Sequence, residues 1–266
     1  MVLSELERGK AMNDELRLHY EENYQEDGRL RRSNGHKIEL LTTVHYFDKL
    51  LPPGSRILDV CAGGGEYAFY LAGRGHEVFA CDLLEKHVDI MRAKPDADKL
   101  VGIEIANALD LSQFGGGSFN VVLCMGALYH LFESAGREKC VAECLRVLEP
   151  GGMFVFAYVN RNGAYIADLC RRNESVQSLA QVMKTGCNGV FYGMDFGEVN
   201  TLVGKFPLKK IADIGTNGLR YPLADIINSA TEEEFDAYME YHLATCEEPS
   251  IIGHSTNGLW IGRKTR

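Results

Sequence analysis

A glycine-rich turn between two short apolar segments constrains the fold of this chain more than any other feature. The stretch ILDVCAGGGEYAFYLAGRGHEVFACDL, residues 57–83, predicts a strand, a turn at Gly63-Gly64-Gly65, a helix carrying Tyr67 to Leu71, and a second strand that ends at Asp82. A strand, a glycine turn, a helix and a strand make one half of a nucleotide-binding α/β unit. Because three consecutive glycines cost chain entropy, they favour close approach of a ligand over a simple tight turn.

Segments with strand and helix spacing alternate along most of the chain. Helical spacing runs through HKIELLTTVHYFDKLLPPG, residues 36–54, until two prolines and a glycine end it just before the first strand. Further strands are expected at 101–105, 120–125 and 153–159, with a helix and a Pro-Gly-Gly turn before the last of these. Such alternation predicts the α/β class, with a parallel sheet covered by helices on both faces.

The regular alternation ends after Val159. Residues 161–205 combine helical spacing with irregular chain, a sixth strand is expected in FPLKKIADIG, helical spacing returns from about 223 to 245, and NGLWIGRK predicts a final strand. With no internal repeat and no low-complexity linker, the sequence predicts a single domain over residues 1–266. Its expected parts are an N-terminal cap or lid at 1–37, a cofactor-binding core at 38–160, an inserted cap at 161–205, and strands and helices that complete the sheet at 206–266.

Charge and cysteine content narrow the class of partner. The formal net charge of −9 over 266 residues repels a phosphate backbone, so nucleic-acid binding is disfavoured, and no apolar run is long enough to cross a bilayer. Eight cysteines without a C-x-x-C pair, and a polar N-terminus without a signal-peptide pattern, predict reduced thiols and a cytoplasmic location. Cys140 and Cys144 fall on the apolar stripe of a helix, so we expect core residues and no metal site.

Polar residues follow the expected strands at the edge where a ligand binds. Asp59 ends the first strand two residues before Cys61, and Asn107 follows the third strand in ANALDL. The segment LRVLEPGGMFVF then supplies a helix, a tight turn and a strand. The spacing Gly63-x-Gly65-x-x-Ala68 also satisfies a relaxed dinucleotide pattern, so a nicotinamide-dependent oxidoreductase remains an alternative.

Together these motifs resemble the class I S-adenosylmethionine-dependent methyltransferases over residues 38–160. The family's glycine motif matches DVCAGGG from Asp59 to Gly65, its ribose-binding acid matches Asp82, and its adenine-side motif matches Asn107-Ala108. Its fourth-strand motif matches MGALYH, residues 125–130, and the GALYHL segment is similar to small-molecule-type bacterial members. Cys61 stands in place of a glycine, Asn107 in place of a frequent Asp, and Asn120 in place of the Asp that commonly precedes the fourth strand. Cys61 is small enough for the turn, and Asn107 still hydrogen-bonds adenine.

The resemblance implies a Rossmann-like, doubly wound, mostly parallel seven-stranded sheet with an antiparallel last strand and helical caps. It implies S-adenosyl-L-methionine as the cofactor, S-adenosyl-L-homocysteine as its product, and transfer of a methyl group to a small-molecule acceptor by in-line displacement. The cofactor-binding residues that it implies are Asp59, Cys61, Ala62, Gly63, Gly65, Asp82, Leu83, Asn107, Ala108, Leu109, Met125 and Gly126.

An acceptor that loses a proton needs a base, and His130, Tyr129, Tyr20 and His36 are the residues we consider for it. A structural role for His130 is an equal alternative to contact with the substrate. For Asp82, the alternative to ribose binding is a D-x-x-E capping box with Glu85 at the start of the next helix. A protein that binds the cofactor without turnover is a further alternative. Several aromatic residues fall outside the pattern of the sheet, and they either line a pocket for the acceptor or pack within the caps. They are Tyr20, Tyr24, Tyr165, Phe191, Tyr192 and Phe196.

Overall fold

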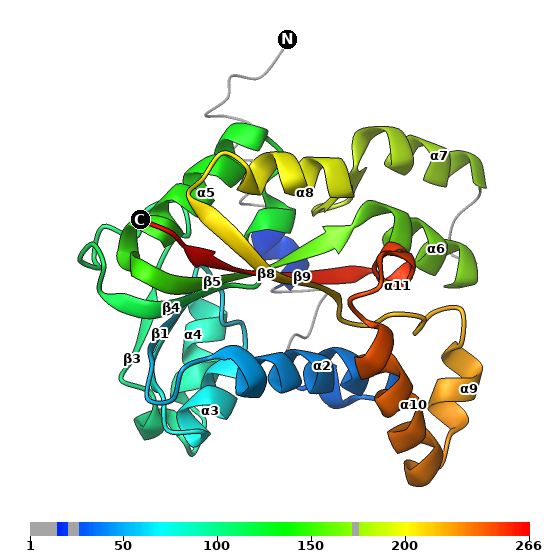
Figure 1. Ribbon diagram of the computed structural model, residues 1–266, viewed down its shortest axis with the longest axis horizontal. Coiled ribbons are helices and arrows are strands. Elements are labelled where there is room, and N and C mark those ends of the chain that lie inside the picture. Colours follow the sequence, from blue (N-terminus) through cyan, green and yellow to red (C-terminus); the bar gives the residue numbers. More distant parts are fainter. Residues whose placement is uncertain (1–14, 21–26, 172–175) are drawn as a thin grey trace.

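One β-sheet with helices on both sides forms the body of the protein in this computed structural model (Figure 1). The structure describes residues 15–20, 27–171 and 176–266. In these residues the strand order is β3-β2-β1-β4-β5, and beyond it β9 pairs with β5 and β8 pairs with β9. The strands are β1 (Arg56–Asp59), β2 (Glu77–Asp82), β3 (Gly102–Ile105), β4 (Phe119–Cys124), β5 (Leu148–Asn160), β8 (Leu208–Gly215) and β9 (Asn257–Lys264).

The predicted α/β class with an antiparallel last strand is confirmed. Strands β1 to β5 run parallel to their neighbours, whereas β9 is antiparallel to both β5 and β8. In addition to the seven expected strands, the sheet contains a short hairpin of β6 (Cys187–Asn188) and β7 (Phe191–Met194), so the described residues form nine strands. Because β6 has two residues and β7 four, neither shows a usable periodicity in the sequence. β7 pairs with Val159 and Asn160 at the end of β5.

The strand register brings the polar residues of the first motifs to one edge. Asp59 at the end of β1 pairs with Ala80 of β2 and with Leu123 of β4. Asp82 at the end of β2 pairs with Ile105, two residues before Asn107. Since parallel strands end at the same edge, the carboxyl ends of β1, β2, β3 and β4 share one side of the sheet.

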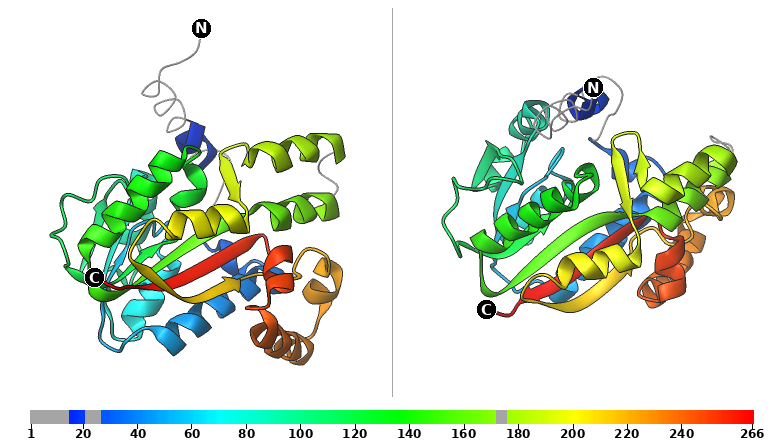
Figure 2. Two further views of the ribbon diagram at one scale, coloured as in Figure 1. Left: turned by 45° about the horizontal axis from the view of Figure 1, so that its top comes forward. Right: turned by 90° about the horizontal axis from the view of Figure 1, so that it is seen from above.

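Two helical layers cover the sheet, one on each face (Figure 2). Side chains alternate along a strand, so Val121 and Leu123 pack with α2, α3 and α4, while Val122 and Cys124 pack with α5 and α8. The helices of these layers are α2 (Asn34–Leu50), α3 (Glu66–Gly73), α4 (Glu85–Arg92), α5 (Ser134–Val147) and α8 (Phe196–Val203).

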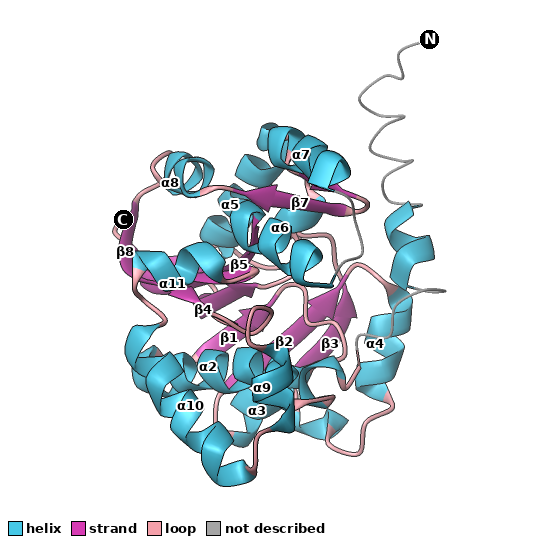
Figure 3. Ribbon diagram, turned by 90° about the vertical axis from the view of Figure 1, so that its right-hand side faces the viewer, coloured by secondary structure: helices cyan, strands magenta, loops and turns pink. Residues whose placement is uncertain are grey.

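The remaining helices gather at the carboxyl end of β5 and after β8. The segment expected to be an inserted cap contains α6 (Arg161–Arg171), α7 (Val176–Thr185), the β6–β7 hairpin and α8 (Figure 3). The helical stretch expected at 223–245 is divided into α9 (Ala224–Ser229) and α10 (Glu232–Thr245). The division falls at Thr231, which forms a capping box with Glu234. A short helix, α11 (Pro249–His254), precedes β9.

The described part of the N-terminal segment lies against the same edge of the sheet. Residues 15–20 are helical, and the backbone carbonyl of Tyr20 accepts a hydrogen bond of 2.7 Å from Lys86 of α4. A turn of 3-10 helix, η2 (Arg29–Arg31), then leads into α2. Two further 3-10 turns are η3 (Ala97–Lys99) and η4 (Leu128–His130). Within the described ranges, no helix combines the length and apolar character that a bilayer crossing requires.

Candidate functional site

A cavity of about 490 Å³ opens at the carboxyl ends of β1, β2, β4 and β5. It is lined by Tyr20, Tyr129 and His130, and by every expected cofactor-binding residue except Gly65. Gly65 has φ +82°, and a side chain there would lie 2.7 Å from the ring of Phe69. Its conformation and the packing of Phe69 therefore account for the glycine. The expected cofactor-binding residues on the wall are Asp59, Cys61, Ala62, Gly63, Asp82, Leu83, Asn107, Ala108, Leu109, Met125 and Gly126.

Asp82 holds the glycine turn in place. Its Oδ2 accepts a hydrogen bond of 2.9 Å from the backbone N–H of Gly63, and its Oδ1 accepts one of 3.0 Å from Leu84. The ring of His87 approaches the same Oδ1 at 3.1 Å through Nδ1. The capping box with Glu85 is not formed, because α4 begins after Leu84 and has no side-chain cap. Asp82 thus serves the cavity and its loops rather than the helix end.

Asp59 belongs to the cavity wall and has a buried carboxylate oxygen. The residue is 2% exposed, and its Oδ1 has no hydrogen-bond partner among the residues that the structure describes. Burial, followed by the nearby charge of Asp82, raises the pKa of Asp59 to about 7. A buried carboxylate oxygen without a partner costs free energy, so the site fits a ligand that brings a hydrogen-bond donor or a positive charge.

The loop after β3 offers a third polar contact. The side-chain oxygen of Asn107 accepts a hydrogen bond of 2.9 Å from the backbone N–H of Leu109, which shapes the loop. Ala106 and Ala108 are buried on either side, so the loop turns its small residues inward. Asn107, Ala108 and Leu109 therefore form a flat, mostly apolar wall with one amide on it, which suits a heteroaromatic ring.

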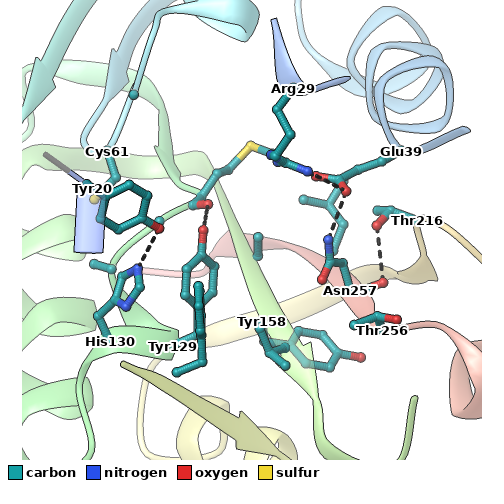
Figure 4. A pocket seen from close by; sticks show the side chains of 18 of the residues that line it. Tyr20, Arg29, Glu39, Cys61, Tyr129, His130, Tyr158, Thr216, Thr256 and Asn257 are labelled. Atoms are coloured by element: carbon teal, nitrogen blue, oxygen red, sulfur yellow. Dashed lines mark hydrogen bonds and ion pairs between the residues drawn. The ribbon is translucent and has the colours of Figure 1, made fainter. Parts of the chain in front are cut away.

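Tyr20, Tyr129 and His130 come together in the cavity wall, with Tyr20 beside Cys61 (Figure 4). His130 Nδ1 lies 2.8 Å from the carbonyl of Val190, so it donates there, and Nε2 then accepts the hydroxyl proton of Tyr20 at 3.1 Å. Burial lowers the pKa of His130 to about 4, which keeps its ring neutral. The hydroxyl of Tyr129 donates to the backbone carbonyl of Met125 at 3.0 Å. Tyr129 is thus engaged with the chain, whereas the Tyr20–His130 pair joins the N-terminal segment to η4.

The other residues considered from the sequence have more varied places. Phe191 lines the cavity and its ring centre lies 5.0 Å from that of His130. His36 bonds Ser33 at 2.9 Å and is not part of the cavity wall. Tyr165, Tyr192 and Phe196 are also outside the wall, and Tyr24 lies outside the described residues.

A polar cluster that the sequence did not predict lines the far end of the cavity (Figure 4). Glu39 of α2 is 8% exposed and accepts hydrogen bonds from Arg29 at 3.2 and 3.0 Å and from Asn257 at 2.8 Å. Burial alone would raise the pKa of Glu39, but Arg29 overcomes it and the pKa is lowered. Thr216 donates to the backbone carbonyl of Asn257 at 3.1 Å.

A sequence signal for part of this cluster exists. The tripeptide Thr-Asn-Gly occurs twice, at 216–218 just after β8 and at 256–258 where β9 begins. Asn217 links the two copies, because its Oδ1 accepts hydrogen bonds from the hydroxyl of Ser255 at 2.7 Å and from the N–H of Thr256 at 2.9 Å. Glu39, in the middle of a helix, has no such signal.

Cysteines gather under the floor of the cavity. The sulfurs of Cys124, Cys140 and Cys144 lie within 4.8 Å of one another, and all three residues are buried, as expected for Cys140 and Cys144. Cys61 belongs to the cavity wall, and a side chain on Gly126 would lie 2.7 Å from its Cβ. Cys61 and Gly126 therefore fit each other as a pair of small residues from neighbouring loops.

Comparison with known proteins agrees with the geometry. Residues 58–156 match the family described as "Methyltransferase domain". The chain is 38% identical over 110 residues to a ubiquinone biosynthesis O-methyltransferase of Thiobacillus denitrificans, covering 41% of this chain and 46% of the relative. It is 36% identical over 123 residues to an S-adenosyl-L-methionine-dependent Diels-Alderase of Talaromyces variabilis, covering 44% and 41% of the two chains. The chain thus spans about half the length of the curated relatives that it matches.

A solved structure extends the likeness of fold. Geranyl diphosphate C-methyltransferase from Streptomyces coelicolor superposes with a TM-score of 0.55 over 86% of this chain and 77% of that chain, at 16% sequence identity. At this identity the likeness concerns the fold alone. The family match ends at residue 156, within β5, whereas the structural similarity covers most of the chain.

Proposed function

We propose that this chain, whose residues 58–156 match a methyltransferase domain, is a class I S-adenosylmethionine-dependent methyltransferase that transfers a methyl group from S-adenosyl-L-methionine to a small-molecule acceptor. The observation that carries the proposal is the meeting of Asp59, Asp82 and Asn107, from three neighbouring strand ends, on the wall of one cavity. The net charge of −9 disfavours nucleic acid as the acceptor.

The cofactor has three polar parts, and the wall offers a partner for each. The unpartnered oxygen of Asp59 suits the ammonium group of the amino-acid portion. Asp82 suits the ribose hydroxyls, and the loop from Asn107 to Leu109 suits the adenine. The Gly63 turn lets the backbone approach the ligand without a side chain.

The bound cofactor supplies an activated methyl group on a sulfonium sulfur. The chain then has to align the acceptor and exclude water. Phe191, Tyr129 and Tyr20 give an aromatic wall for this purpose. Nε2 of the neutral His130 is an acceptor already bonded to the Tyr20 hydroxyl, so we assign to this pair the removal of a proton from an acceptor hydroxyl or ammonium group. We assign to Tyr129 the positioning of the Met125 backbone.

The N-terminal segment closes the site in this proposal. Tyr20 contacts both His87 beside Asp82 and His130 on η4, with ring centres 5.5 and 5.6 Å apart. Hydrogen exchange in residues 15–20 and 27–35 should therefore slow when S-adenosylhomocysteine is added. Unchanged exchange would assign the segment to the fold alone. All eight cysteines are free, which agrees with a cytoplasmic location.

Calorimetric titration separates the alternatives. We expect S-adenosylhomocysteine to bind and to raise the melting temperature, because a ligand selective for the folded state stabilises it. Tight NAD binding without a response to S-adenosylhomocysteine would instead indicate an oxidoreductase. Cofactor binding without transfer of labelled methyl to any member of an acceptor panel would indicate a different use of the bound cofactor.

A further inference from the structure

Four arginines line the cavity, although the protein as a whole is acidic. Three of them are paired with carboxylates. Arg29 bonds Glu39, Arg161 bonds Glu198, and Arg171 bonds Asp168 at 3.2 Å. The fourth is Arg220, in the loop between β8 and α9.

Arg220 differs from the other three in its partners. Among the described residues, its guanidinium has no hydrogen bond or ion pair to a carboxylate, and its contact is with the ring of Tyr221, 4.9 Å from the ring centre. Its charge nevertheless reaches the polar cluster. Burial raises the pKa of Glu39, but the charges of Arg29 and then Arg220 lower it. For His36, burial and then the charge of Arg220 lower the pKa. Arg220 therefore lies near the Glu39 carboxylate, which Arg29 already binds, but forms no ion pair of its own among the described residues.

Tyr221 holds the arginine in a defined orientation. Arg171 also lies over the Tyr221 ring, 4.2 Å from its centre, and donates a hydrogen bond to the Tyr221 hydroxyl. Gly35 leaves room on another side, since a side chain there would lie 3.3 Å from Nε of Arg220. An arginine held against an aromatic ring loses little further freedom on binding an anion.

Two further side chains complete this part of the wall. Thr256 belongs to the wall, and its Oγ1 is buried without a hydrogen-bond partner among the described residues. Tyr158 also belongs to the wall, and its hydroxyl donates to Asp213 at 2.9 Å. This part of the cavity thus combines the Arg220 guanidinium with an aromatic residue and a buried hydroxyl.

We propose that the methyl acceptor carries an anionic group, a carboxylate or a phosphate, that binds Arg220 at the Glu39 end of the cavity. The inference rests on the proposed function and names the chemical class of its acceptor. The anion forms charge-assisted hydrogen bonds with the Arg220 guanidinium, and the aromatic wall holds the apolar part of the molecule. Arg220 is a specificity-determining residue in this assignment.

Matched pairs of probes test the proposal in the presence of S-adenosylhomocysteine. The anions are 4-hydroxybenzoate, 4-hydroxyphenylacetate and 4-hydroxyphenyl phosphate, each compared with an uncharged counterpart: 4-hydroxybenzamide, 4-hydroxyphenylacetamide and hydroquinone. Inorganic phosphate serves as the free-anion probe. By calorimetry we expect at least one anion to bind about tenfold or more tightly than its counterpart, as charge-assisted hydrogen bonds allow. The carboxylates and the phosphate compounds then show which anion is preferred.

Substitutions test whether Arg220 causes the preference for anionic probes. Arg220→Gln should remove the preference for the anion, and Arg220→Lys should keep part of it. The control Arg32→Gln removes an equal charge near His36 from an exposed residue outside the cavity wall, and should keep the preference. Melting curves establish that each variant is folded.

Three results would overturn the inference: counterparts that bind as well as the anions, no binding by any anion including phosphate, or an unchanged preference in Arg220→Gln. The cofactor provides a further check, because it carries its own carboxylate. Affinity for S-adenosylhomocysteine should stay within about twofold in Arg220→Gln; a tenfold fall would assign Arg220 to the cofactor and reject the acceptor assignment. If the unaltered protein fails to bind S-adenosylhomocysteine, the proposed function itself fails.

Discussion

The two ends of the cavity are built in different ways. The cofactor end uses strand ends and tight loops from one continuous stretch, between Asp59 and His130. The far end uses side chains from α2 and α6, from the loop after β8, and from the start of β9. Backbone turns demand glycine and short-range spacing, whereas side chains from distant elements meet only after folding. The first end therefore leaves a motif in the sequence, and the second leaves almost none.

Replacement of Asp82 should have the largest effect on the affinity for S-adenosylhomocysteine, and so should separate the two ends most clearly. Asp82→Ala removes the acceptor of the Gly63 and Leu84 N–H groups and of the expected ribose hydroxyls. We expect affinity for S-adenosylhomocysteine to fall by about 1.5–3 kcal/mol, the range for hydrogen bonds to charged groups. Calorimetry measures the loss. As a control, Asp89→Ala on α4 removes a carboxylate outside the cavity wall and should leave affinity unchanged.

The Asp82 variant also checks the division between the two ends. Replacement of Glu39 by Gln should leave S-adenosylhomocysteine affinity much less affected, because Glu39 belongs to the far end. Equal losses in Asp82→Ala and Glu39→Gln would mean that the cofactor extends over both ends, and the comparison would break down.

A second test concerns the close fit of Cys61 and Gly126. Gly126→Ala places a methyl group 2.7 Å from the Cβ of Cys61, so we expect a loss of about 1–3 kcal/mol in the free energy of unfolding and weaker cofactor binding. In Cys61→Gly the obstructing atom is absent. The double variant Cys61→Gly/Gly126→Ala should then regain most of the free energy of unfolding that Gly126→Ala loses. Urea unfolding of the unaltered protein, the two single variants and the double variant measures this coupling. Simple additivity of the two changes would contradict the fit.

Strong local signals account for what the sequence did predict. The glycine turn, the apolar strands and the acid at the end of β2 are set by neighbours a few residues away, and β9 was expected at the bounds it has. The β6–β7 hairpin was missed because its strands are too short for a period. The expected contact between Gly65 and the cofactor stays a prediction, since Gly65 is not among the residues that line the cavity. Arg29, Glu39 and Asn257 carry no common motif, since a contact across 218 residues is decided by the topology.

Acid should destabilise the packing of α10. Burial lowers the pKa of His242 in α10 to about 4, so between pH 6.5 and 4 the unfolded chain takes up a proton that the folded chain refuses. Its contribution to stability is therefore complete above about pH 6.5 and is lost as the pH falls, at no more than about 1.4 kcal/mol per pH unit. Hydrogen exchange at pH 5 should be faster in α10 than in β1 to β4. His242→Gln should reduce the pH dependence; an equal slope in that variant would assign it to other groups.

The smallest expected effect is confined to α10. Thr231 accepts a hydrogen bond of 3.3 Å from the N–H of Glu234 at the start of this helix. Thr231→Ala should lower the free energy of unfolding by about 1 kcal/mol, the usual cost of a lost N-terminal cap. Affinity for S-adenosylhomocysteine should not change. A cofactor effect of this distant substitution would show that the two ends are energetically coupled through α10 and α2.

The hydrogen bond between Asp82 and Gly63 has a kinetic consequence. Since the protein already holds the turn in its conformation, we expect that cofactor association does not wait for the loop to form. If the N-terminal segment closes the site as proposed, the association rate should depend on how often that segment leaves the cavity open. The dissociation rate should depend instead on the strength of the contacts with the cavity wall, because a departing ligand has to break them. Changes at Asp82 should therefore appear mainly in the time that the cofactor stays bound, and changes at Tyr20 mainly in the speed with which it enters.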